Sequence, residues 1–100
     1  MAVEFQHDVV IVGSGAAGLS TALHLADHAR VAIVTKRRLL DSATLYAQGG
    51  VSVVLDKQDS LESHIQDTLA AGAGLCDEAA TRFAVEHGPA AVQWLIDKGI

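Results

Sequence analysis

The chain has 100 residues, a formal net charge of −5 at pH 7 and one cysteine, Cys76. This length suits one small domain or a piece of a larger one. The acidic balance, with no basic run longer than Lys36 to Arg38, argues against nucleic-acid binding. No apolar run approaches the ~20 residues of a membrane span, and the first residues, MAVEFQHD, lack the apolar core of a secretory signal. We therefore expect a cytoplasmic protein without nucleic-acid or membrane partners, and its single cysteine forms no internal disulfide.

The first predicted elements are a strand, a glycine-rich turn and a helix. Residues 8–18 read DVVIVGSGAAG, in which apolar β-formers run into the glycines and two alanines open a helix expected over residues 16–28. A second apolar run, Val31–Val34, predicts the next strand, and a strand that is apolar throughout is typical of a parallel sheet buried on both faces. This order of elements is that of a dinucleotide-binding βαβ unit.

Each glycine of the turn has its own physical role. Gly13 allows the tight turn after the strand, Gly15 lets the backbone approach a pyrophosphate, and Gly18 lets the helix pack closely on the strand. The helix N-terminus offers free N–H groups to phosphates, and Ser14 adds a hydroxyl donor. A glycine-rich turn that binds nothing is the alternative, but the strand before it and the helix and strand after it favour binding.

The second strand is followed by a basic residue where many dinucleotide-binding domains have an acidic one. A carboxylate at that place accepts hydrogen bonds from the ribose hydroxyls. Here the place holds Thr35 and Lys36, and a lysine contacts a phosphate or the adenosine region instead. The sequence therefore does not favour a simple NAD-dependent dehydrogenase.

The middle of the chain predicts a loop, a short strand and a helix. Residues 39–50 are small, polar and glycine-terminated, so we expect a shaped loop rather than a regular element. Residues 51–55 predict a short strand. Asp59 and Glu62 have the spacing of a capping box, and apolar residues follow at helical intervals until Gly72 ends the helix.

The last third of the chain predicts two further helices. Asp77 is the expected N-cap of a helix that runs to His87. Gly88 stops that helix, and Pro89 suits the first position of a final helix that ends near Lys98. Taken together, the elements predict an α/β fold in which helices follow the βαβ unit.

The sequence supports no metal site and no nucleophile. His24, Asp27 and His28 have a spacing that metal ligands also show, but no further ligand is in view and a solvated helix face explains them. Cys76 is interpreted as a small buried residue, because nothing near it in the sequence would activate a thiolate.

Several stretches resemble one flavoprotein family, which contains L-aspartate oxidase and the flavoprotein subunits of succinate dehydrogenase and fumarate reductase. They are DVVIVGSGAAGLS, the strand that ends in Thr35 and Lys36, and the loop SATLYAQGGVS. Two later stretches, DSLESHIQDTLAAGAGLCDE and VQWLIDKGI, resemble the L-aspartate oxidase branch of that family. The resemblance covers residues 8–100.

The resemblance implies a fold and a set of cofactor-binding residues. Residues 1–100 would be the N-terminal portion of a single FAD-binding domain with a Rossmann-like, doubly wound parallel sheet, in a longer enzyme. Residues 14–17 would cradle the pyrophosphate, Lys36 would lie near the adenosine half, and residues 43–50 would line the flavin. The full expected set is Gly13, Ser14, Gly15, Ala16, Ala17, Gly18, Lys36, Ala43, Thr44, Leu45, Tyr46, Ala47, Gln48, Gly49 and Gly50.

The resemblance also implies that FAD is held without a covalent bond. Succinate dehydrogenase subunits place a flavin-linked histidine four positions before the alanine of their AQGG, and Ala43 stands at that position here. A departure from the family pattern at this residue favours the L-aspartate oxidase branch.

The activity implied by the resemblance is the oxidation of L-aspartate to iminoaspartate, with oxygen or fumarate as acceptor, as the first step of de novo NAD biosynthesis. The residues that bind substrate in that family lie outside this chain, so no catalytic residue is predicted. Two alternatives stay open: a flavoprotein subunit of a succinate dehydrogenase or fumarate reductase, and a non-catalytic nucleotide-binding remnant.

Overall fold

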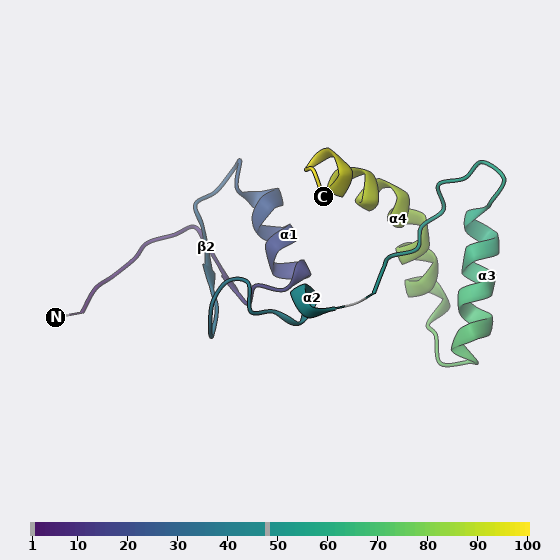
Figure 1. The fold of residues 1–100 in the computed structure, drawn as a ribbon, viewed down its shortest axis with the longest axis horizontal. Coiled ribbons are helices and arrows are strands. Elements are labelled where there is room, and N and C mark those ends of the chain that lie inside the picture. The colour runs from purple at the N-terminus through teal and green to yellow at the C-terminus, as the bar shows by residue number, and fades with distance from the viewer. Residues whose placement is uncertain (1, 48) are drawn as a thin grey trace. The chain divides into compact units, whose positions relative to one another are not determined.

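The computed structural model describes residues 2–47 and 49–100, and the chain divides into two compact units. The first unit is Met1–Gly49 and the second is Gly50–Ile100. A parallel pair of strands in the first unit and helices in the second confirm the predicted α/β fold (Figure 1).

The first unit contains the predicted βαβ arrangement. The strands β1, Val9–Val12, and β2, Val31–Val34, pair in parallel, with Val9 opposite Val31 at the start of the register. The helix α1, Ala16–Leu25, connects them and packs against both (Figure 1). Parallel neighbours need such a crossover connection, because each strand must return to the same end of the sheet.

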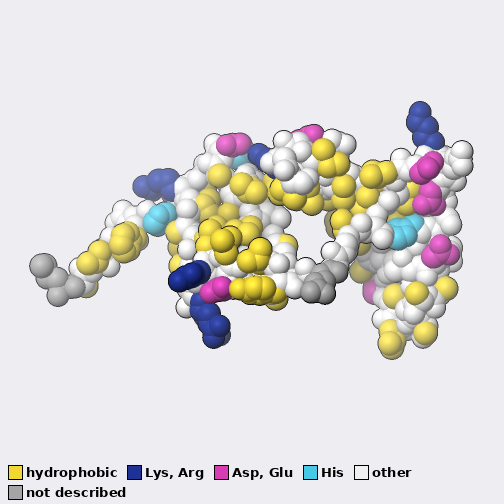
Figure 2. Space-filling model, viewed as in Figure 1, with side chains coloured by type: hydrophobic (Ala, Val, Ile, Leu, Met, Phe, Trp, Pro, Cys, Tyr) yellow, Lys and Arg dark blue, Asp and Glu magenta, His cyan; other side chains and the backbone are white. Residues whose placement is uncertain are grey.

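One face of the strand pair is covered by α1 and the other is open. Ile11 lies against Gly18 of α1, whereas Val10 and Val12 on the opposite face of β1 are 57% and 86% exposed. Figure 2 shows hydrophobic side chains at the surface in both units. The exposure of the side chains therefore alternates along β1, because only one face of the strand is covered by a helix.

The helix α1 is shorter than the predicted range of residues 16–28. Its regular part ends at Leu25, and the N–H groups of His28 and Ala29 both donate to the carbonyl oxygen of Leu25 at 2.9 Å. These shared bonds tighten the last turn and redirect the chain into β2, so the helical pattern of the sequence extends beyond the helix itself.

The predicted loop over residues 39–50 contains one helical turn. This turn, α2, spans Ala43–Tyr46, and the hydroxyl of Ser42 accepts the N–H of Leu45 at 3.2 Å as an N-cap. The prediction of a loop without regular structure is wrong here, because the capping hydroxyl satisfies an N–H group that the first turn would leave unpaired.

The second unit begins with the helix α3, Leu61–Gly72, whose end at Gly72 is as predicted. Its N-cap is Ser60, whose hydroxyl accepts the N–H of Ser63 at 3.0 Å. The predicted capping box is therefore wrong. The carboxylate of Asp59 instead accepts the N–H of Ser60 at 2.7 Å, and Glu62 forms an ion pair with another helix.

A single helix, α4, spans Glu78–Asp97 where two helices were predicted. Asp77 is its N-cap, as expected. Gly88 and Pro89 do not end the helix, because tertiary packing keeps the surrounding turns in place despite the N–H that proline lacks. The position of Gly88 is used for packing instead, since a Cβ there would lie only 3.0 Å from Cγ1 of Val53.

Residues 51–55 form no strand, which corrects the prediction. Val53 of this segment packs against α4 instead and is half-buried. A strand needs a hydrogen-bonded neighbour, and the described residues of this unit provide only helices as regular elements.

The most buried side chain of the second unit is Ile65 on α3, which is 0% exposed. None of the helices formed by residues 2–47 and 49–100 is both long enough and apolar enough to cross a membrane.

Candidate functional site

The glycine-rich turn leaves β1 at the edge where β2 also ends. Gly13 donates its N–H to the carbonyl oxygen of Val34 at 2.8 Å, so the strands stay joined one residue beyond β1. Gly13 has a φ of 113°, which L side chains rarely adopt, and the predicted tight turn is thereby confirmed. Ligands of parallel α/β sheets bind at this carboxyl edge of the strands.

The other two glycines of the turn differ in what surrounds them. A Cβ on Gly18 would lie 2.6 Å from the carbonyl oxygen of Gly13, which confirms the predicted close packing of α1 on the strand. A Cβ on Gly15 would meet only Oγ1 of Thr44, at an ordinary distance of 3.7 Å. One side-chain oxygen at an ordinary contact distance therefore borders the space in front of the Gly15 backbone.

The start of α1 presents hydrogen-bond donors to that space. Gly15 is the N-cap and carries no capping side chain, and the N–H groups of Gly15 and Ala17 find no acceptor among the described residues. The N–H of Ala16 donates to Oγ1 of Thr44 at 3.1 Å. Ser14 is 6% exposed, and no described residue accepts or donates a hydrogen bond to its hydroxyl. Such a set of donors suits an anion.

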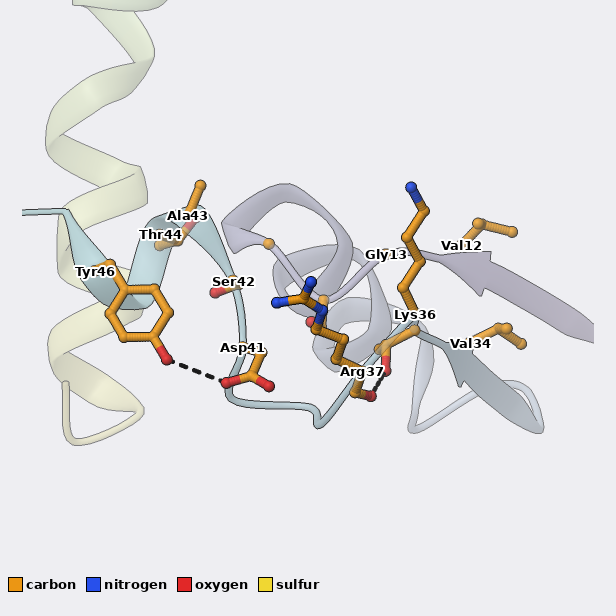
Figure 3. Close-up of a pocket in the computed structure, with 13 residues that line it drawn as sticks. Val12, Gly13, Val34, Lys36, Arg37, Asp41, Ser42, Ala43, Thr44 and Tyr46 are labelled. Atoms are coloured by element: carbon orange, nitrogen blue, oxygen red, sulfur yellow. Dashed lines mark hydrogen bonds between the residues drawn. The ribbon is translucent and has the colours of Figure 1, made fainter.

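The segment between β2 and α2 is held in shape by its own hydrogen bonds (Figure 3). The hydroxyl of Thr35 donates to the carbonyl oxygen of Arg37, and the hydroxyl of Tyr46 donates to Oδ1 of Asp41 at 3.1 Å. The N–H of Asp41 donates to the carbonyl oxygen of Arg38 at 2.9 Å. This segment is therefore an ordered wall opposite the glycine turn.

A hollow of about 740 Å³ lies between the glycine turn, the end of β2 and α2 (Figure 3). This volume falls within the range of about 300–1,000 Å³ that is usual for small-molecule sites. The residues that line the hollow are Val12, Gly13, Ser14, Gly15, Val34, Thr35, Lys36, Arg37, Asp41, Ser42, Ala43, Thr44 and Tyr46.

The lining of the hollow carries a net positive charge in a chain that is acidic overall. Lys36 and Arg37 are both exposed at the end of β2, and neither side chain forms an ion pair among the described residues. Asp41 supplies the one carboxylate of the lining. Two cations against one anion favour a ligand that carries phosphate groups. The described residues bring together no group of three or more metal-ligating side chains.

The structure brings together predicted site residues from the glycine turn and from the segment after β2. Gly13, Ser14 and Gly15 of the turn line the same hollow as Lys36, Ala43, Thr44 and Tyr46. The remaining members lie elsewhere: Ala16, Ala17 and Gly18 form the first turn of α1, Leu45 and Ala47 belong to α2 and its C-cap, Gly49 follows, and Gly50 begins the second unit. Gln48 lies outside the described residues.

The sequence did not select six lining residues: Val12, Val34, Thr35, Arg37, Asp41 and Ser42. Val12 and Val34 are the last residues of their strands, so the rule that ligands bind at strand ends would have found them. Asp41 and Ser42 stand just before the loop stretch chosen by resemblance, and their roles as hydrogen-bond acceptors from Tyr46 and Leu45 are seen only once the loop is folded.

Comparison with known proteins shows a consistent set of similarities. The model of the FAD binding domain family matches residues 8–100. L-aspartate oxidase 1 of Ralstonia nicotianae is 60% identical over 93 residues, which are 93% of this chain and 17% of that protein. L-aspartate oxidase of Pseudomonas aeruginosa is 55% identical over 100 residues, which are 100% of this chain and 19% of that protein.

A solved structure is also similar. It is a mutant of quinol fumarate reductase from E. coli, with a TM-score of 0.84 and 37% identity over 95% of this chain and 17% of that chain. The chain thus spans about a fifth of the length of the curated relatives that it matches. Because the family model covers nearly the whole chain, this chain belongs to the FAD binding domain family, with FAD as its cofactor.

Proposed function

We propose that this chain is the FAD-binding part of an L-aspartate oxidase. The observation that carries the proposal is its 55% identity, across all 100 residues, to the L-aspartate oxidase of Pseudomonas aeruginosa. In such an enzyme the flavin supplies the redox chemistry by accepting a hydride, and the protein binds and orients both flavin and substrate.

The start of α1 is the proposed site of the pyrophosphate. Gly15 and Ala17 have N–H groups without an acceptor among the described residues, and the open space at Gly15 admits a phosphate group. Ser14 and Lys36 line the same hollow. We propose that Lys36 contacts the adenosine half of the dinucleotide. These residues fit a dinucleotide because they combine donors, positive charge and room at one strand edge.

We propose that the flavin is bound without a covalent bond. Residues 43–50 would line it, and Ala43 is the member of this stretch that stands where a covalently linked subunit has histidine. Ala43 lines the hollow with a methyl group, which has no nucleophilic atom to attach to the flavin. Non-covalent binding therefore depends on hydrogen bonds, charge and shape alone.

The proposed reaction is the oxidation of L-aspartate to iminoaspartate in the cytoplasm, as the first step of de novo NAD biosynthesis. L-aspartate loses two electrons and two protons, and either oxygen takes them to give hydrogen peroxide or fumarate takes them to give succinate. No residue of this chain is assigned to the substrate or to proton transfer. The remainder of a longer enzyme is the proposed source of those groups, because the relatives are about five times as long.

The similarity to E. coli quinol fumarate reductase supports a second candidate, a succinate or fumarate oxidoreductase. These two candidate functions can be distinguished with the full-length protein loaded with FAD. L-aspartate or succinate is added to it in the absence of oxygen. We expect L-aspartate to bleach the visible flavin absorbance and succinate not to do so. Bleaching by succinate alone would favour the second candidate, and bleaching by neither would leave a non-catalytic nucleotide-binding remnant.

A further inference from the structure

Three exposed basic residues, Lys36, Arg37 and Arg38, follow the end of β2. Lys36 and Arg37 line the hollow beside the glycine turn, whereas Arg38 does not. None of the three side chains forms an ion pair with a residue in the ranges 2–47 and 49–100. The described protein therefore leaves the charge of the Arg37 guanidinium available to an anionic ligand in the hollow.

The backbone that carries these cations is held by hydrogen bonds. The hydroxyl of Thr35 donates to the carbonyl oxygen of Arg37, and the N–H of Asp41 donates to the carbonyl oxygen of Arg38 at 2.9 Å. Figure 3 shows that the side chains of Lys36 and Arg37 leave the end of β2 in different directions. The two cations can therefore contact two different groups of one ligand.

The position of Arg37 in the fold indicates which part of a nucleotide it would meet. In dinucleotide-binding folds the pyrophosphate lies at the start of the helix, and the residues that end the second strand face the adenosine ribose. A carboxylate there binds the free ribose hydroxyls, whereas an arginine there accommodates a phosphate on the 2′ oxygen. The one carboxylate of the lining, Asp41, already accepts the hydroxyl of Tyr46 at 3.1 Å.

We propose that the hollow binds, in addition to FAD, an adenine nucleotide with a phosphate on its ribose 2′ oxygen, and that Arg37 binds this phosphate. The ribose of FAD carries no such phosphate, so FAD leaves this guanidinium without an anion. A guanidinium can donate two parallel hydrogen bonds to phosphate oxygens. The nucleotide occupies the hollow proposed for FAD, so it competes with FAD and opposes loading of the enzyme. This inference rests on the proposed FAD site.

Two nucleotides that differ only in the 2′-phosphate test the proposal. Flavin-free, full-length protein is titrated with AMP and with adenosine 2′,5′-bisphosphate in a calorimeter. We expect the bisphosphate to bind about tenfold or more tightly, because a charged hydrogen-bond acceptor has been added opposite Arg37. The ratio of the two affinities should fall at high salt, because Arg37 is exposed. Equal affinities would overturn the inference.

Arg37→Gln should reduce the ratio of the two affinities to about one. Arg37→Lys should keep part of the preference, because it retains the charge but not the paired donors. The matched control is Arg38→Gln, which removes the same charge from the next residue, outside the hollow, and should leave the ratio unchanged. Each ratio is measured on one protein, so a loss of folded protein affects both nucleotides alike. A fall in Arg38→Gln as large as in Arg37→Gln would contradict a specific contact with Arg37.

Competition with FAD locates the bound nucleotide. Adenosine 2′,5′-bisphosphate should raise the FAD concentration that half-saturates the protein, and a bisphosphate that binds without this effect would lie outside the hollow and overturn the inference. Adenosine 3′,5′-bisphosphate should bind more weakly than the 2′,5′ isomer. Tighter binding of the 3′,5′ isomer would contradict a site for the 2′-phosphate.

These measurements also distinguish this inference from the proposed FAD site. Wild-type protein that binds FAD but does not prefer the 2′,5′-bisphosphate to AMP would contradict the role of Arg37 alone. Wild-type protein that binds neither FAD nor any of the nucleotides would contradict the proposed FAD site.

Discussion

The carboxylate of Asp8 accepts the backbone N–H of Arg30 at 2.8 Å, and Nη2 of the Arg30 guanidinium lies 3.1 Å from its other oxygen. The pair joins the start of β1 to the start of β2, at the end of the strands away from the hollow. The bond from the guanidinium, followed by that from the N–H, holds the pKa of Asp8 below its ordinary value of 3.8.

The Asp8 pair predicts a stability that depends on pH. Because the pKa is lowered on folding, the stabilisation is present above pH 3.8 and is lost as the pH falls below that value. Asp8→Ala should therefore lower the urea midpoint at pH 7 and have little effect in strong acid. Asp27→Ala is the control, because no described residue bonds its carboxylate. Equal midpoints for Asp8→Ala and wild type at pH 7 would disprove this prediction.

The helices α3 and α4 are joined by an ion pair that also makes the stability of the protein depend on pH. Oε2 of Glu62 lies 2.7 Å from Nη1 of Arg82, and the bond from Arg82, with a smaller one from Gln66, lowers the pKa of Glu62 from 4.5 to about 2. The stabilisation is present above pH 4.5 and is lost as the pH falls through about 2. Glu62→Gln should lower the urea midpoint at pH 7, less so in high salt.

Glu78→Gln provides the matched comparison for that ion pair. Its carboxylate lies 3.8 Å from the same Arg82 guanidinium, but within α4 rather than across the two helices. We expect a smaller loss at pH 7 than for Glu62→Gln. A larger loss for Glu78→Gln would mean that Arg82 stabilises α4 itself and not its contact with α3.

The close approach of α1 to β1 predicts a large effect at Gly18. A Cβ there would lie 2.6 Å from the backbone oxygen of Gly13, which cannot move without disturbing the turn. Gly18→Ala should destabilise the protein by about 1–3 kcal/mol in urea unfolding, as overpacking does. Gly50→Ala should cost far less, because nothing lies within 4 Å of its Cβ position. Equal losses of stability in the two variants would contradict the close packing of α1 on β1 at Gly18.

A substitution at Gly15 should reduce FAD binding rather than stability, unlike a substitution at Gly18. Its backbone is extended, with φ −73° and ψ 177°, and a Cβ would make only an ordinary contact. Gly15→Val should therefore fold with nearly the stability of the wild type, yet lose FAD binding because its side chain fills the proposed phosphate space. Fluorescence titration with FAD measures this, and unchanged affinity in the folded variant would show that the pyrophosphate lies elsewhere.

The strand pair and the glycine turn of the first unit were predicted well because their signals are local. The run from Val9 to Val12 and the spacing of Gly13 and Gly18 define the strand, the turn and the close packing by sterics within a few residues. The composition of the hollow was predicted only in part. Asp41 lines it and accepts a hydrogen bond from Tyr46, and such loop contacts depend on how the whole segment folds.

The second unit shows why other predictions failed. Residues 51–55 have the composition of a strand, but a strand depends on a partner that the local sequence does not reveal. Pro89 has the local character of a helix start, whereas packing keeps α4 continuous through it. At the start of α3, Asp59 and Ser60 are both good capping residues, and their order in the chain alone does not decide which one caps.

The claim that these residues hold FAD without a covalent bond can be tested most directly by the absorbance spectrum of the purified protein, desalted after incubation with FAD and then precipitated with acid. We predict that flavin co-elutes with the protein and is released into the supernatant by acid, because Ala43 offers no atom for attachment. Flavin that stays with the precipitate would contradict non-covalent binding. Protein that elutes without flavin would contradict the FAD site itself.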